Sequence, residues 1–101
     1  AAFPGIRQVT FGHLGDGNLH YNVVPPVGHD PAAFAARRDA GARAVHDAVA
    51  AREGSISAEH GLGVLKSDEA LRYKDPAQVA AMRAVRDALD PRRVMNPRVL
   101  F

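Results

Sequence analysis

Near its start, the chain alternates polar and apolar positions with the two-residue period of a β-strand. Residues 7–11 (RQVTF) carry β-favouring side chains, and residues 19–24 (LHYNVV) alternate so that Leu19, Tyr21 and Val23 share one face. A glycine-rich loop joins the two runs, and two prolines follow the second run. The pattern therefore predicts an antiparallel hairpin that ends at the prolines.

Beyond the prolines, the apolar positions change to helical spacing. Asp30 followed by Pro31 indicates a helix start, because the carboxylate can cap the first turn and proline lies where no N–H donor is needed. We expect this helix to run to about Arg52 and to stop at Gly54. Its buried side should carry Phe34, Ala42, Val45 and Val49.

The remainder of the chain predicts one short strand and two helices. Residues 55–58 (SISA) are predicted as a third strand, residues 64–73 as a modest helix, and residues 76–89 as a longer helix after a second Asp-Pro start signal. One stripe of the last helix should be apolar, with Val79, Met82, Val85 and Leu89. This order of elements predicts an α+β fold, a small antiparallel sheet packed by helices.

The composition is that of an ordinary globular protein with a thin core. Of the 101 residues, 47% are hydrophobic and 24% are charged, but many of the hydrophobic residues are alanines, which bury little area. The absence of cysteine excludes disulfides and thiolate metal ligands. The net charge is only +2 and arginines alternate with acids along the helical stretches, so we expect no nucleic-acid partner. No apolar run reaches the roughly 20 residues of a membrane span, and we expect a cytoplasmic protein or one peripheral to the membrane.

The residues with the clearest chemical potential lie at the ends of the predicted strands. His13 ends the first strand and His20 begins the second, while Glu59 follows the third predicted strand beside another glycine turn. Two imidazoles and one carboxylate leave an open coordination position, as catalytic zinc sites do, and manganese or iron accept the same ligands. Two alternatives stay open here: the histidines are unrelated to a metal, or the glycines only form a turn. A phosphate-binding loop is excluded, because the loop has no lysine and no helix follows it.

Three motifs in one order carry a resemblance to a known family. GHLGDGNLHYN at residues 12–22, SAEHGLG at residues 57–63 and LDPRRVMNP at residues 89–97 resemble the C-terminal part of the FAD-linked oxidases. This group includes D-lactate dehydrogenases, the glycolate oxidase flavoprotein subunit and D-2-hydroxyglutarate dehydrogenase. The resemblance covers residues 8–97 and implies that the sheet and its helices are part of a ferredoxin-like substrate (cap) domain.

The resemblance implies roles for individual residues of these motifs. It makes His13, His20 and Glu59 the ligands of a divalent metal, with zinc as the first choice and manganese or iron as alternatives. It makes His60 the active-site base, and it makes Asn22 a residue that contacts the substrate.

The resemblance also implies a flavin cofactor and a larger protein. It gives Asn96 a role in cofactor binding, although the family's Asn-Pro-Gly-Lys ending is replaced here by Asn-Pro-Arg. FAD would be bound mainly by an N-terminal domain that has no counterpart in residues 1–101. We therefore expect a C-terminal fragment, inactive alone, of an FAD-dependent enzyme that oxidises a D-2-hydroxyacid to the 2-oxoacid.

Two further functions are compatible with the same ligands. One is a free-standing metal-dependent hydrolase with His60 as its base, and the other is a non-catalytic, metal-stapled assembly module. If the chain is instead the fragment of a dehydrogenase, its partners are a small 2-hydroxyacid substrate and the missing FAD-binding domain. An uncovered apolar surface then favours a homo-oligomer. That surface should include Phe3, Val94, Met95 and Phe101.

Overall fold

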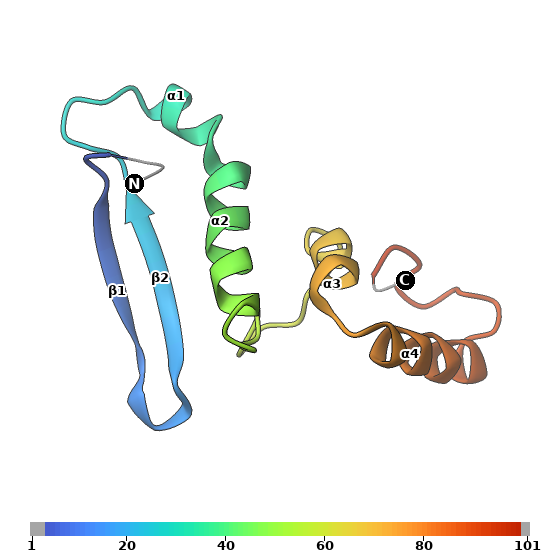
Figure 1. Ribbon diagram of the computed structural model, residues 1–101. Coiled ribbons are helices and arrows are strands. Elements are labelled where there is room, and N and C mark those ends of the chain that lie inside the picture. The colour runs from blue at the N-terminus through green and yellow to red at the C-terminus, as the bar shows by residue number, and fades with distance from the viewer. Residues whose placement is uncertain (1–3, 100–101) are drawn as a thin grey trace. The chain divides into compact units, whose positions relative to one another are not determined.

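A computed structural model describes residues 4–99 of the chain (Figure 1). The chain divides into two units, the first ending at Ala58 and the second beginning at Glu59. The described residues contain a two-stranded antiparallel sheet and four α-helices, which confirms the α+β prediction. The assignment to a ferredoxin-like domain stays a prediction. Phe3 and Phe101, two residues expected on an uncovered apolar surface, lie outside the described residues.

The predicted hairpin is present and is longer than the sequence pattern indicates. β1 spans Arg7–His13 and β2 spans Asn18–Val24, and a single 3-10 turn at Leu14–Asp16 connects them (Figure 1). The two strands pair antiparallel along their whole length. His13 and His20 therefore both belong to strands and not to the loop.

At two positions of this hairpin, Gly12 and Gly17, the backbone geometry favours glycine over any other residue. A Cβ on Gly12 would lie 1.9 Å from the backbone oxygen of Asn18, closer than real Cβ atoms come. Gly17 ends the 3-10 turn with a φ of 65°, in the left-handed region where glycine has no steric penalty. A Cβ on Gly15, by contrast, would meet nothing within 4 Å. The geometry of the hairpin thus depends on glycine at residues 12 and 17.

Apolar side chains lie on both faces of the hairpin. Leu19, Tyr21 and Val23 share one face, as predicted, and all three are exposed. Val9 and Phe11 lie on the opposite face and are exposed as well. A two-stranded hairpin is at best marginally stable in water unless something packs against it. The hairpin therefore leaves much apolar surface uncovered within the described residues.

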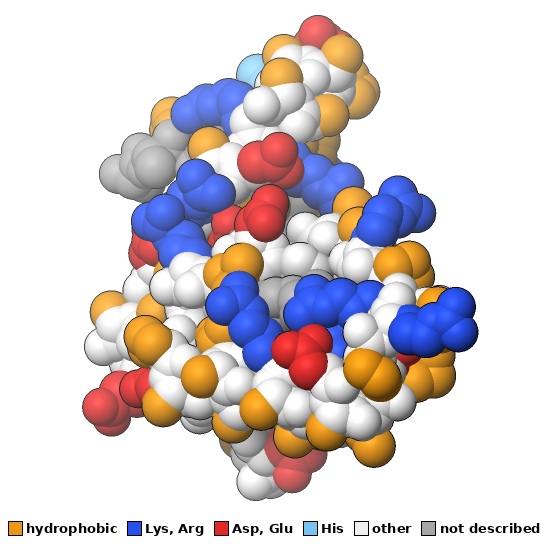
Figure 2. All heavy atoms as spheres, turned by 90° about the vertical axis from the view of Figure 1, so that its right-hand side faces the viewer, with side chains coloured by type: hydrophobic (Ala, Val, Ile, Leu, Met, Phe, Trp, Pro, Cys, Tyr) orange, Lys and Arg blue, Asp and Glu red, His pale blue; other side chains and the backbone are white. Residues whose placement is uncertain are grey.

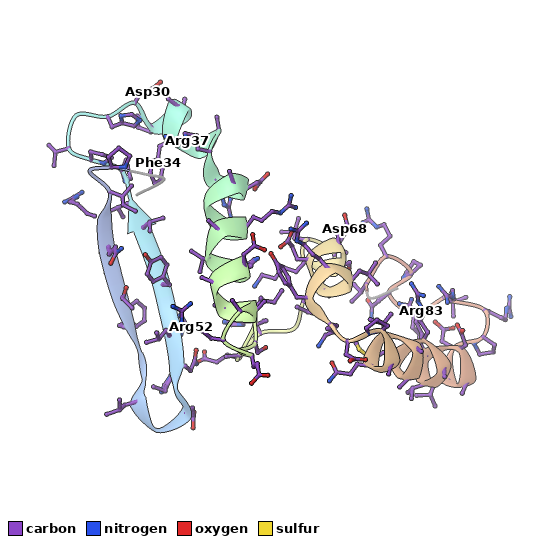
Figure 3. The ribbon with its side chains drawn as sticks, in the orientation of Figure 1. Asp30, Phe34, Arg37, Arg52, Asp68 and Arg83 are labelled. Carbon is purple, nitrogen blue, oxygen red and sulfur yellow. The ribbon has the colours of Figure 1, made fainter. Side chains whose placement is uncertain are left out.

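The helix predicted after Pro26 begins as expected but is not continuous. Asp30, labelled in Figure 3, accepts a hydrogen bond from the backbone N–H of Ala32 at 3.0 Å, and α1 spans Pro31–Ala35. A turn then separates α1 from α2, which spans Arg38–Ala50. The prediction of one continuous helix was wrong, because the residue before α2 has φ −98° and ψ 3°, outside helical values. No glycine or proline marks this break in the sequence.

The end of α2 and its burial agree in part with the sequence pattern. The backbone N–H of Gly54 donates to the carbonyl of Val49 at 3.0 Å, which supports Gly54 as the stop signal. Phe34, Val45 and Val49 are half-buried, and Figure 3 shows Phe34 pointing from α1 toward the hairpin. Ala42 is exposed, so its predicted burial was wrong. On α1 and α2, the larger apolar side chains of the predicted buried side are therefore half-buried, and the small one is not.

Residues 55–58 do not form the predicted third strand. The hydroxyl of Ser55 donates to the backbone oxygen of Ser57 at 2.9 Å, and the same oxygen atom of Ser55 accepts from the Ser57 N–H at 3.4 Å. Local side-chain bonds of this kind satisfy backbone groups that a strand would offer to a neighbour. The prediction that Glu59 follows a strand was therefore wrong.

The second unit contains two helices near their predicted positions. α3 spans Ser67–Tyr73 and begins later than predicted, because the residues before it form a turn. α4 spans Pro76–Leu89, as the start signal predicts. Asp75 caps α4 by accepting a hydrogen bond from the N–H of Ala77 at 2.7 Å. The Asp-Pro signal thus has the same structural cause at both of its positions in the chain.

Only part of the predicted stripe on α4 is covered. Val79 is buried, with 7% of its surface exposed, and so is Ala70 on α3. Met82 is half-buried. Val85 and Leu89 are 60% and 75% exposed, so the second half of the stripe is uncovered within the described residues. The second unit, like the hairpin, therefore has exposed apolar side chains, here near the C-terminal end of α4.

Two charged side chains at the end of α4 hold the closing segment of the chain. Asp90, only 6% exposed, accepts hydrogen bonds from the backbone N–H groups of Val94 at 3.0 Å and Met95 at 2.8 Å. The guanidinium of Arg86 donates to the carbonyls of Met95 at 3.2 Å and Asn96 at 3.0 Å. Bonds to charged groups are stronger than neutral ones, so this pair of side chains fixes the path of the tail.

Charged side chains of both signs are distributed over the surface. In Figure 2, Lys and Arg side chains lie among acidic and hydrophobic ones on the face that is drawn. Among residues 4–99, no helix is both long enough and apolar enough to cross a membrane.

Candidate metal and substrate site

The pairing register places the two histidines of the first motif on one face of the hairpin. Phe11 lies opposite His20, and His13 lies opposite Asn18. Directly paired residues point to the same face and successive residues alternate, so His13 and His20 are diagonal neighbours on that face. Diagonal neighbours are separated by about 7–8 Å, a span that two imidazole rings can close. Strand pairing alone thus brings these two side chains together.

Glu59 contributes a third potential ligand. One ligand atom from each of His13, His20 and Glu59 lies within 4.8 Å of the others. Glu59 is bonded directly to Ala58, the last residue of the first unit, so it adds a ligand at the very start of the second unit. His20 is half-buried, whereas the other two residues are exposed. The three predicted ligands are therefore close enough to be candidates for a metal site, and metal binding by them stays a prediction.

The donor chemistry of this set fits a divalent transition metal. Imidazole nitrogen and carboxylate oxygen bind zinc at about 2.0–2.2 Å, so two atoms on one ion lie at most about 4.4 Å apart. The spread of up to 4.8 Å is slightly larger. Side-chain rotation can close this difference, because the terminal torsions of histidine and glutamate are broad. Three ligands leave at least one position open on a tetrahedral ion, and manganese or iron accept the same donors.

An aromatic ring beside the histidines was missed by sequence reasoning. Phe11 stacks on the ring of His20, with ring centroids 4.8 Å apart and an interplanar angle of 5°. The two residues are direct partners in the strand register. The sequence carried a signal for this contact. If His13 pairs with Asn18 across the loop, Phe11 must pair with His20. The imidazole of His20 thus has an aromatic ring stacked on it and the other two candidate ligands nearby.

Asn22 lies on the same face as the two histidines. It is two residues beyond His20 on β2, and Val9 is its partner on β1. At a rise of about 3.3–3.4 Å per residue, the two positions are about 7 Å apart along the strand. Asn22 is exposed, so its amide is accessible from this face. A contact between Asn22 and substrate stays a prediction.

His60 and Asn96 belong to the second unit. His60 follows Glu59 directly, is exposed, and lies in a segment without helix or strand. Asn96 has a φ of 44°, and its backbone carbonyl accepts the hydrogen bond from Arg86. This bond fixes the main chain at Asn96 and leaves the exposed residue at the surface of the tail. The catalytic role of His60 and the cofactor role of Asn96 stay predictions.

The remaining histidines are separate from this set. Among the described residues, neither His29 nor His46 belongs to a group of potential metal ligands. His29 lies in the exposed turn before α1, and His46 is half-buried on α2.

The chain matches the family model of FAD linked oxidases, C-terminal domain, over residues 2–100, and it belongs to this family. The resemblance inferred from the three motifs is thereby confirmed.

Curated relatives are similar to this chain over nearly its whole length. The D-2-hydroxyglutarate dehydrogenase of Xanthomonas citri is 40% identical over 99% of the chain, and that of Stutzerimonas stutzeri is 39% identical over 98%. The D-lactate dehydrogenase of Archaeoglobus fulgidus is 36% identical over 92% of the chain. The chain spans about a fifth of the length of these relatives, 21%, 21% and 20% respectively. The similarity is therefore to one part of longer proteins.

Proposed function

We propose that this chain is the C-terminal, substrate- and metal-binding part of an FAD-dependent dehydrogenase that oxidises a D-2-hydroxyacid to the 2-oxoacid. Family membership supports the flavin. The names of the relatives, D-2-hydroxyglutarate dehydrogenase and D-lactate dehydrogenase, support the substrate class and favour this function over a hydrolase. In this proposal an FAD-binding domain lies elsewhere in the longer protein and covers part of the exposed apolar surface.

The observation that carries the proposal is the grouping of His13, His20 and Glu59. Their ligand atoms lie within 4.8 Å of one another, on a hairpin face that also bears Asn22. This arrangement supports a site where a metal and a small oxygen-rich molecule meet. Neutral imidazoles and a carboxylate would hold zinc, manganese or iron there.

The chemistry of a 2-hydroxyacid explains why such groups are useful. The hydroxyl group is hard to deprotonate at neutral pH; a bound divalent metal would supply positive charge that lowers this cost, and a bound flavin would supply the hydride acceptor.

The protein's own residues have three tasks in this proposal. Asn22 binds a carboxylate or hydroxyl oxygen of the substrate through its side-chain amide and orients it on the hairpin face. His60 accepts the hydroxyl proton on a ring nitrogen. His13, His20 and Glu59 would hold the metal ion.

Zinc titration of the 101-residue chain tests the ligand set directly. Isothermal titration calorimetry should give one zinc site, and His13→Ala, His20→Ala or Glu59→Gln should each weaken it by more than about 100-fold. Loss of an outer-shell partner alone costs about 10- to 100-fold in metal affinity, and loss of a ligand costs more. His29→Ala is the matched control, because it removes an exposed histidine outside the group.

Two results would contradict this proposal. Equal zinc affinities for His13→Ala and His29→Ala would mean that the bound metal is held elsewhere. In the longer protein, failure of D-2-hydroxyglutarate and of D-lactate to bleach the flavin would reject the proposed substrate class.

A further inference from the structure

We propose that Phe11 is a positioning residue for the metal ligand His20. The inference rests on the proposed function, since it assumes that His20 binds a metal. It assigns a task to an exposed aromatic side chain that no core explains, because Phe11 is 57% exposed.

The geometry of the pair carries the argument. Phe11 and His20 are direct cross-strand partners, and their rings are nearly parallel at 5° with centroids 4.8 Å apart. Such a separation lies within the range of favourable aromatic stacking. The contact restrains the ring plane of His20, which the broad final torsion of histidine would otherwise leave free to rotate.

Restraining that plane matters because a metal binds in the plane of an imidazole ring, along a nitrogen lone pair. Stacking covers a face of the ring and not the edge that carries its two nitrogens. The ligand atoms of His13 and Glu59 lie within 4.8 Å of the ligand nitrogen of His20. Phe11 thus supports the face of the ring, while a ring nitrogen of His20 lies near the other two candidate ligands.

Phe11 does not itself belong to the group of candidate ligands. It occupies the same strand as His13, two residues earlier, and stacks on the histidine of the other strand. The hairpin register therefore sets the position of His13, and stacking on Phe11 additionally sets the orientation of His20. This division predicts that changing Phe11 weakens metal binding without abolishing it.

Zinc affinity of the whole chain provides the test. Phe11→Leu should raise the zinc Kd about 2- to 12-fold, the loss expected from one aromatic pair. Phe11→Tyr keeps the stacked ring and should restore the affinity to within about 2-fold of the original. Val9→Ala is the control, because Val9 lies on the same strand and face and is also exposed, but faces Asn22.

Proton NMR of the metal-free chain gives a second readout. The aromatic ring current of Phe11 should shift the ring protons of His20, and this shift should disappear in Phe11→Leu and persist in Phe11→Tyr. Circular dichroism checks that the strands remain in each variant.

The possible outcomes separate this inference from the proposed function. Equal zinc affinities for the original chain and Phe11→Leu, or an equal loss in Val9→Ala, overturn the positioning role and leave the proposed function intact. Absence of zinc binding by the original chain overturns both. If zinc does not bind but the His20 ring protons show the expected ring-current shift, the two rings stack without any role in metal binding.

Discussion

In the hairpin, backbone pairing and two glycines determine the geometry, whereas in α4 and its tail two charged side chains do so. The hairpin brings His13 and His20 together through register, and its side chains are mostly exposed. At the end of α4, Asp90 and Arg86 bond the main chain of the tail. The difference teaches that the positions of His13 and His20 depend on backbone geometry, while the path of the tail depends on one buried and one half-buried charged side chain.

The largest expected effect is at His60, which lies neither in the hairpin nor in α4 and its tail. In the flavoprotein to which this chain is proposed to belong, His60→Ala should slow flavin reduction by about 10²- to 10⁴-fold, the loss typical for a general base. Metal content and flavin content should stay unchanged. Stopped-flow measurement of flavin bleaching gives the rate.

A rate equal to that of the original protein would remove His60 from the chemistry. The hairpin would then carry the binding functions proposed here without a base from the second unit. His46→Ala serves as the control for loss of an imidazole outside the ligand group.

The dependence of the ligands on backbone geometry predicts a large effect at Gly12. Gly12→Ala places a Cβ where the oxygen of Asn18 lies 1.9 Å away, so the strand ends must move apart. Forcing extra atoms into a filled space costs about 1–3 kcal/mol, which corresponds to roughly a 5- to 150-fold higher zinc Kd if the shift separates His13 from His20. Calorimetric titration measures it.

Gly15→Ala is the matched control in the same loop, because its Cβ would have no atom within 4 Å. It should change the zinc Kd by less than about 2-fold, as surface substitutions generally do. Similar losses in both variants would show that loop flexibility, and not the close approach at Gly12, governs the site.

The smallest expected effect is at Asp90, and it tests whether this side chain holds the tail that follows α4. Asp90→Asn keeps the shape of the side chain but replaces charged acceptors with one neutral acceptor. We expect a local loss of about 1–2 kcal/mol, or about 5- to 30-fold lower hydrogen-exchange protection at the amides of Val94 and Met95. The zinc affinity should not change.

Asp87→Asn is the control on the same helix. Its carboxylate pairs with Arg93 at 2.9 Å, and both side chains are about half exposed, at 54% and 47%. Exposed pairs contribute at most about 1 kcal/mol and act locally. If Asp90→Asn lowered the zinc affinity as much as Gly12→Ala did, the two regions would not be separable in the way described.

Features with a local cause could be predicted from the sequence. The strands follow from two-residue alternation, and the starts of α1 and α4 follow from Asp30 and Asp75, whose carboxylates accept the predicted bonds. The convergence of His13 with His20 also follows from local pairing, since both lie close to the same turn.

Features that depend on a partner segment could not be predicted in this way. Residues 55–58 have strand-like composition, but a strand needs a neighbour, and Ser55 instead bonds to Ser57. The break before α2 falls among good helix formers, so no residue there marks it. The bonds that Asp90 accepts from two later N–H groups could not be predicted either, because they depend on the path of the tail.

The short segment between His13 and His20 has a consequence for the order of folding. Contacts between residues near in sequence form early, and hairpins close within about 1–10 μs, long before distant segments meet. Two of the three candidate ligands can therefore meet in a nascent chain once residues 7–24 are free to pair. A metal bound by these two histidines would favour the closed hairpin by mass action, so the earliest-forming part of the chain would also be the part that the ion stabilises first.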